Sequence, residues 1–232
     1  MTAGKLSFSN APSVAVTTDW QDSVSTSGKP GQKSRTQPGK FISCLEEQCQ
    51  LLVASSRSLG DELFSSLPHF SVLSAQLTVQ SERSKAIDGE LTESLCHSLI
   101  TPIDCEDLKR LSHVIHKLTA TQLRLAQTFH AVAGTAYSYV HLQEEVVQCT
   151  DALFQAVQAL NTATLPNTCS NLHICWRKAR TSLRQMHQQQ WADEGDVRHR
   201  LTEQLLYFEF SAELGYVKAA YDTLMRARLK NG

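Results

Sequence analysis

Residues 101–129 read TPIDCEDLKRLSHVIHKLTATQLRLAQTF, and this stretch decides the fold class. Its large apolar side chains recur three or four residues apart, which places them on one face of an α-helix. Asp104 is a natural N-cap, Asp107 falls at the third helical position, and Glu106 adds another acid to the first turn. We therefore predict a helix that begins after Asp104, with Asp104 and Asp107 as structural helix caps. The apolar face consists of Leu108, Leu111, Ile115, Leu118, Leu125 and Phe129.

The same helical spacing extends toward the N-terminus. Apolar side chains of residues 41–66 fall at heptad-like steps, and Pro68 is expected to close that helix. A second helix is predicted over residues 72–99. The core residues expected on these two helices are Phe41, Leu45, Leu52, Leu59, Leu63, Leu73, Leu77, Ile87, Leu91 and Leu95.

Downstream, helices are predicted over residues 137–160, 171–190 and 193–228. The first of these either follows Gly134 as a separate helix or continues the helix before it, and Pro166 is expected to break the next junction. No segment alternates as a β-strand would, so we predict an all-α antiparallel bundle of two three-helix units that meet near residue 135. The expected core side of the last helix is Val197, Leu201, Leu205, Phe208 and Ala212.

Composition divides the chain into a tail and a body. Residues 1–40 are rich in Ser, Thr, Gly and Pro and contain few large apolar side chains, so we expect a disordered, weakly basic tail. Residues 41–230 form the bundle. Of all 232 residues, 41% are hydrophobic and 19% are charged, which is enough apolar surface for a core.

Charge and cysteine content exclude several classes of function. The formal net charge is −1, so we expect no nucleic-acid partner, because such binding needs many basic groups against phosphate. No apolar run reaches the roughly 20 residues that span a bilayer. The seven cysteines follow no secretory signal, which indicates free thiols in a cytoplasmic protein.

Candidate chemical motifs are weak. Residues 28–34 read GKPGQKS, but a phosphate-binding loop needs Gly where Gln32 stands. His113 and His116 could share a helix face as metal ligands, although surface histidines are the more frequent explanation. The basic run 177–180 beside Trp176 could bind RNA or anionic lipid, but a polar helix face is the simpler interpretation. We expect no catalytic residues, no metal and no cofactor.

One junction resembles a known family. Residues 99–108, LITPIDCEDL, closely resemble the link between the second and third helices of the PhoU-like phosphate transport regulators. Residues 41–53 are similar to the opening helix of that family. The resemblance extends over about residues 41–230 and implies an all-α bundle.

The family's acidic, metal-holding positions are occupied by other residues in this chain. In the implied register, Asp222 alone keeps an acid on the last helix. A hard cation needs several converging oxygen ligands, so the resemblance implies the fold but not the metal site. The substituted positions are Arg83, Lys85, His116, Ala120, Ile174, Trp176, Gly215 and Lys218.

The resemblance also implies a function. We expect a non-enzymatic, cytoplasmic helical regulator linked to phosphate transport or phosphate homeostasis. Its partner would be a protein, with a phosphate transporter at the inner face of the membrane as the first candidate, and it could form homo-oligomers. The alternative is a divergent helical scaffold or dimerisation module that is unrelated to phosphate.

Overall fold

The computed structural model describes residues 39–98, 103–131, 139–191 and 197–231, and these residues form six helices without any strand. The all-α prediction is therefore confirmed. The predicted tail lies outside the described residues, except that the first helix begins at Gly39, two residues before the expected boundary. The helices are α1 (Gly39–Phe64), α2 (Phe70–His97), α3 (Cys105–Ala131), α4 (Val140–Gln158), α5 (Leu165–Trp191) and α6 (Val197–Asn231).

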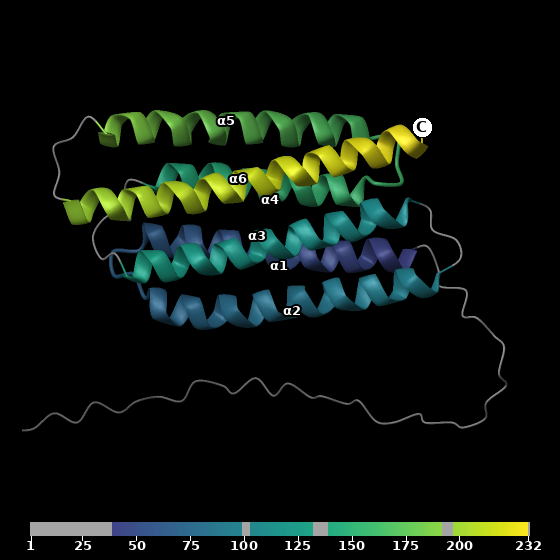
Figure 1. The fold of residues 1–232 in the computed structure, drawn as a ribbon, viewed down its shortest axis with the longest axis horizontal. Helices are drawn as coiled ribbons and strands as arrows, with labels where there is room; N and C mark the ends of the chain where they lie inside the picture. The colour runs from purple at the N-terminus through teal and green to yellow at the C-terminus, as the bar shows by residue number, and fades with distance from the viewer. Residues whose placement is uncertain (1–38, 99–102, 132–138, 192–196, 232) are drawn as a thin grey trace, which may run out of the picture. The chain divides into compact units, whose positions relative to one another are not determined.

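Successive helices run antiparallel (Figure 1), and they form two similar halves. Helices α1, α2 and α3 contact one another, and so do α4, α5 and α6. The halves meet where α1 packs on α4 and α3 packs on α6. In Figure 1 these four helices lie between α2 and α5, which cover opposite sides of them. The two predicted three-helix units thus form one bundle with four central and two outer helices.

The first three helices bury the faces that their spacing predicts. All core residues expected on α1, α2 and α3 have under a tenth of their surface exposed. Their burial removes apolar surface from water at about 25 cal/mol per Å². At one end of the bundle an aromatic cluster joins both halves, since Phe129 stacks at 5.7 Å from Phe70 and lies 5.9 Å from Tyr139. Tyr139 in turn stacks on Phe210 of α6 at 5.4 Å.

The junction before α5 differs from the prediction. Helix α5 begins at Leu165, six residues before the expected start, and Pro166 lies inside its first turn. Proline is tolerated there because the first N–H groups of a helix have no intrahelical partner. Pro166 therefore starts this helix instead of interrupting the chain.

The expected core side of α6 is wrong. Val197, Leu201, Leu205 and Phe208 are 71%, 68%, 48% and 57% exposed, and Ala212 is exposed as well. The helix carries a second stripe of apolar and polar residues at the same spacing, and this second stripe packs against α3, α4 and α5. Its buried members are Glu203, Leu206, Phe210, Glu213, Leu214, Val217, Ala220, Thr223, Leu224 and Ala227.

None of the described helices has the length and apolar character needed to cross a membrane.

Candidate functional site

Asp104 starts α3 in the way its sequence position suggests. Its Oδ1 accepts a hydrogen bond from the Glu106 backbone N–H at 2.9 Å, and its carbonyl oxygen accepts one from the Leu108 N–H at 3.1 Å. The first contact satisfies one of the N–H groups that a helix start leaves without an intrahelical acceptor.

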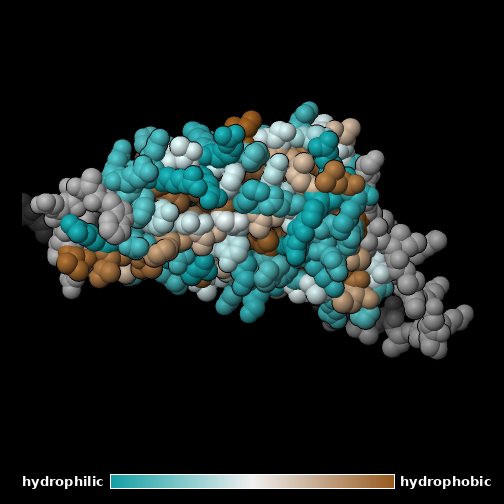
Figure 2. Space-filling view, turned by 45° about the horizontal axis from the view of Figure 1, so that its top comes forward, coloured by the Kyte–Doolittle hydropathy of each residue, from teal (hydrophilic) through white to brown (hydrophobic). Residues whose placement is uncertain are grey.

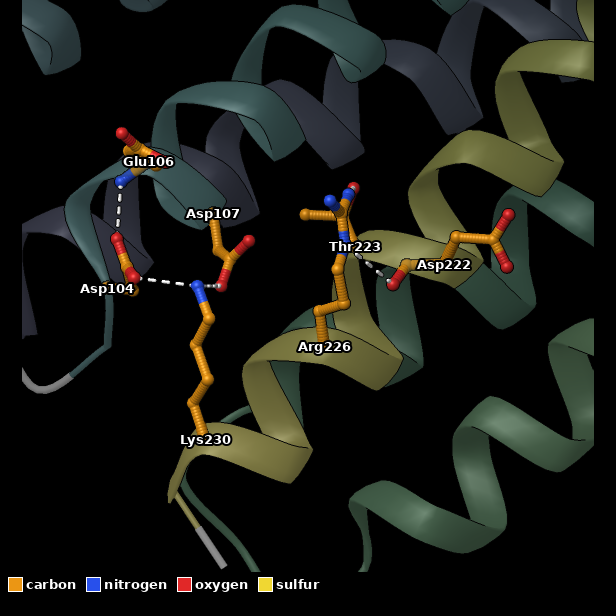
Figure 3. A network of polar contacts seen from close by, with 7 residues as sticks. All are labelled: Asp104, Glu106, Asp107, Asp222, Thr223, Arg226 and Lys230. Atoms are coloured by element: carbon orange, nitrogen blue, oxygen red, sulfur yellow. Dashed lines mark hydrogen bonds and ion pairs between the residues drawn. The ribbon is translucent and has the colours of Figure 1, made fainter.

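Asp104 and Asp107 together hold the end of α6. Lys230 donates from Nζ to Asp104 Oδ2 at 2.6 Å and to Asp107 Oδ2 at 2.9 Å. Figure 3 shows Lys230 reaching from α6 to both carboxylates at the start of α3. The hydrogen bond from Lys230 lowers the pKa of Asp104, and the two carboxylates raise the pKa of Lys230. This contact links the two halves of the bundle at one end.

A second polar cluster lies at the centre of the bundle and takes one residue from each central helix. Gln143 of α4 donates from Nε2 to the Ser56 carbonyl of α1 at 3.0 Å and lies 3.3 Å from Gln122 Oε1 of α3. Gln122 donates from its own Nε2 to Glu213 Oε1 of α6. All four residues have no exposed surface. We call Ser56, Gln122, Gln143 and Glu213 the central polar network.

Burial dominates the chemistry of Glu213. Loss of hydration raises the pKa of its carboxyl from 4.5 to about 8, while the hydrogen bond from Gln122 lowers it to a smaller degree. The carboxyl is therefore mainly protonated at neutral pH. Glu213 Oε2 and Gln143 Oε1 are buried without a hydrogen-bond partner in the structure, so the network keeps unused bonding capacity in the core.

The sequence analysis did not predict this network, although the positions of Gln122 and Glu213 within apolar stripes indicate that both are buried. Gln122 stands between Leu118 and Leu125 on the apolar stripe of α3, and Glu213 stands between Phe210 and Val217 on the buried stripe of α6. A polar residue in register with a core stripe has to find a buried partner or leave its polar atoms unsatisfied.

The basic run of α5 lies at the surface beside α6. Trp176 donates its indole N–H to the Leu214 carbonyl at 2.9 Å, which fixes the ring against α6. The Arg180 guanidinium lies 5.3 Å from the centre of that ring, and Lys218 Nζ of α6 lies 5.7 Å from it. Arg177 is also exposed. Because α5 contains no Asp or Glu, its outer surface is basic. We call Arg177, Lys178, Arg180 and Arg184 the α5 basic face.

The rings of His113 and His116, the histidine pair suggested by the sequence, lie 6.4 Å apart, but their nitrogen atoms differ in their partners. His113 Nδ1 lies 3.3 Å from Asp88 Oδ2, whereas Nδ1 of the half-buried His116 has no hydrogen-bond partner. Burial lowers the pKa of His116. Among the described residues, no group of three or more His, Cys, Asp or Glu side chains is arranged to hold a metal ion.

Two of the positions at which an acid was expected from the resemblance hold basic side chains, and both of these form ion pairs. Arg83 of α2 pairs with Glu47 at 2.7 Å and with Glu90 at 3.4 Å. Lys218 of α6 pairs with Asp222 and lies 5.2 Å from the Tyr221 ring centre. The prediction that the chain binds no metal stays a prediction. The phosphate-loop-like residues 28–34 lie outside the described part of the chain.

The fold has known structural relatives, whereas the sequence matches no family model and no curated protein. A PhoU-like protein from Shewanella oneidensis MR-1 matches the structure with a TM-score of 0.60 and 13% identity, over 82% of this chain and 95% of the other. A candidate PhoU-like phosphate regulatory protein from the same organism matches with a TM-score of 0.58 and 13% identity, over 82% and 94% of the two chains. The described helices therefore have the fold of the PhoU-like proteins, as the junction at residues 99–108 indicated.

Proposed function

We propose that this chain is a non-enzymatic helical regulator that acts in phosphate transport or phosphate homeostasis. The observation that carries the proposal is the structural match to a candidate PhoU-like phosphate regulatory protein over 94% of that protein's length. The match includes both halves of the bundle and not only one helical hairpin.

The position of the polar groups supports a binding role. The carboxyl with the most strongly raised pKa, that of Glu213, is fully enclosed by the four central helices and cannot reach a substrate. It accepts its hydrogen bond from Gln122, another core side chain, as in networks that specify one packing arrangement. We therefore assign the central polar network to the fold and the outer helix surfaces to recognition.

The α5 basic face is the surface we assign to the protein partner. Arg177, Arg180 and Arg184 are exposed on one outer helix, and Trp176 fixes the middle of that helix on α6. Arginine forms bidentate hydrogen bonds with carboxylates, so this surface suits an acidic protein segment. A cytoplasmic acidic segment of a phosphate transporter would meet this requirement.

The proposal is tested in the organism that encodes the chain. Cells that lack it are compared with cells that express wild type or the triple variant Arg177→Glu, Arg180→Glu, Arg184→Glu, and phosphate uptake is measured under phosphate-starved and phosphate-replete conditions. We expect deletion to change phosphate-dependent uptake. The triple variant should fail to restore it, because charge reversal repels an acidic partner.

The matched control reverses charge on the other outer helix, at Arg83 and Lys85 of α2. This control should restore uptake as wild type does. Unchanged uptake after deletion would contradict the link to phosphate and favour the alternative, a helical scaffold or dimerisation module. Restoration by the triple variant would instead reject the α5 basic face as the partner surface.

A further inference from the structure

Two cations from different helices lie against the indole ring of Trp176. The Arg180 guanidinium of α5 lies 5.3 Å from the ring centre, and Lys218 Nζ of α6 lies 5.7 Å from it. A cation is attracted to the electron-rich face of an indole ring, which offsets part of the repulsion between two like charges. The ring therefore brings a guanidinium and an ammonium group together at the seam between α5 and α6.

The ring itself is held by both helices. Its indole N–H donates to the Leu214 carbonyl of α6 at 2.9 Å. His173 of α5 stacks on Trp176 with 5.6 Å between ring centres and on Tyr221 of α6 with 4.9 Å between ring centres. Because this platform is fixed before any ligand arrives, little ordering is needed when a ligand binds to the cations on it.

The cations at this seam outnumber the carboxylates. Helix α5 contains no Asp or Glu, and no described carboxylate forms an ion pair with Arg177 or Arg180. Among the described residues, Lys218 pairs with Asp222. Three cations, Arg177, Arg180 and Lys218, thus face a single carboxylate, which leaves an excess charge of about +2.

The excess charge lies at an open surface. Arg177 and Arg180 are exposed, and Trp176 is half-buried. Figure 2 turns the α5 side of the bundle toward the viewer and shows a mainly hydrophilic surface there, with hydrophobic side chains gathered at the left end of the view. A ligand dissolved in water can therefore reach the seam without a change in the fold.

We propose that Arg177, Arg180 and Lys218 form a binding site for a phosphate dianion beside the Trp176 ring. A phosphate group carries a charge of about −1.5 to −2 at neutral pH, which matches the excess at the seam better than the single charge of one carboxylate. Arginine binds two phosphate oxygens at once, and lysine adds a point charge.

The site deepens the proposed function and gives it a means of regulation. Phosphate bound at Arg177 and Arg180 would compete with the acidic partner segment for the same two guanidinium groups. This regulatory consequence rests on the proposed function, whereas binding of phosphate to the purified chain does not.

NMR of the full chain labelled with ¹⁵N tests the site. The indole N–H signal of Trp176, identified by its loss in Trp176→Phe, is followed at pH 8 and constant ionic strength while inorganic phosphate is added to about 20 mM. We expect a saturable shift with a Kd on the order of 1 mM. Sodium acetate at the same ionic strength should give no saturable shift, because each acetate carries one charge.

Arg180→Gln should weaken phosphate binding roughly tenfold or more. The matched control is Lys178→Gln, which removes an equal charge from the same turn of α5, but at a side chain that pairs with Glu145 of α4 at 3.5 Å. The control should change the Kd by about twofold or less. Equal weakening by the two variants, a saturable shift with acetate, or no shift with phosphate would overturn the site.

A second titration identifies the source of the phosphate group. If N-acetyl-phosphoserine amide binds about tenfold more tightly than inorganic phosphate, the site recognises a phosphorylated side chain; equal or weaker binding supports free phosphate as the ligand. Phosphate binding together with unchanged uptake after deletion would support the site and reject the proposed function. Absent binding together with uptake that depends on the α5 basic face would reject the site alone.

Discussion

Glu213 connects the protonation state of one side chain to the stability of the fold. Its pKa is raised from 4.5 to about 8 by burial. Between these two values the unfolded chain loses the proton while the folded chain keeps it. The free energy of unfolding therefore falls as the pH rises through this window, by at most about 1.4 kcal/mol per pH unit from this group.

Replacement of Glu213 by Gln should remove that pH dependence. Glutamine has the shape of the protonated acid, can accept the hydrogen bond from Gln122, and does not ionise. Urea unfolding at pH 5, 6, 7 and 8 should show that the variant becomes more stable relative to wild type as the pH rises. Parallel pH profiles for the two proteins would show that Glu213 is ionised in the folded state or is open to solvent.

Asp104 permits a second test at the residue scale. Asp104→Ala should lower the melting temperature by about 2–4 °C, because the Glu106 N–H loses its side-chain acceptor. Asp104→Asn keeps an oxygen acceptor but loses the charge that faces Lys230, so it should remain close to wild type in thermal denaturation. If both variants are equally destabilised, the ion pair rather than the cap is the important contact.

At the residue scale, the sequence was sufficient to predict only contacts between residues close together in the chain. The cap at Asp104 depends on residues within four positions of it, so the sequence was sufficient to identify it. The contact of Lys230 with Asp107 joins positions 123 residues apart and depends on how α6 packs on α3. The same is true of Gln122 and Glu213, which are 91 residues apart.

Helix α6 shows that the sequence pattern of a helix does not always determine which of its faces is buried. Two apolar stripes share this helix, and the sequence alone favoured the stripe that contains Leu205 over the one that contains Leu206. The buried stripe includes Glu203, Glu213 and Thr223, so it has the more polar composition. Tertiary packing selected it, because Glu213 accepts a hydrogen bond from Gln122 of α3 and Glu203 accepts one from the Tyr139 hydroxyl, which lies before α4.

Neighbouring leucines test the burial of α6 directly. Leu206 is fully buried and Leu205 is 48% exposed. Leu206→Ala should reduce the free energy of unfolding by about 2–5 kcal/mol through lost transfer energy and a cavity, while Leu205→Ala should change it by about 0.5 kcal/mol or less. Chemical denaturation measures both free energies of unfolding. If Leu205→Ala were instead the more destabilising change, the buried face of α6 would be the one expected from the sequence.

At the scale of the whole molecule, the spacing of apolar residues and the positions of prolines were sufficient to predict an all-α bundle of two halves. They could not predict how the halves meet, because every helix has a core face and any two such faces can pack. The structure settles this by packing α1 on α4 and α3 on α6. The central polar network adds specificity, since its hydrogen bonds form in only one alignment of these helices.

A double-mutant cycle between Gln122 and Glu213 tests most directly whether the two halves form one body joined through buried polar contacts. Gln122→Leu, Glu213→Leu and the double variant are compared with wild type by urea unfolding at pH 6, where Glu213 is protonated. We predict a coupling free energy of about 0.5–3 kcal/mol, because each single change leaves a buried polar group without its partner. Additive effects, with a coupling indistinguishable from zero, would show that α3 and α6 do not meet at these residues and would contradict this arrangement.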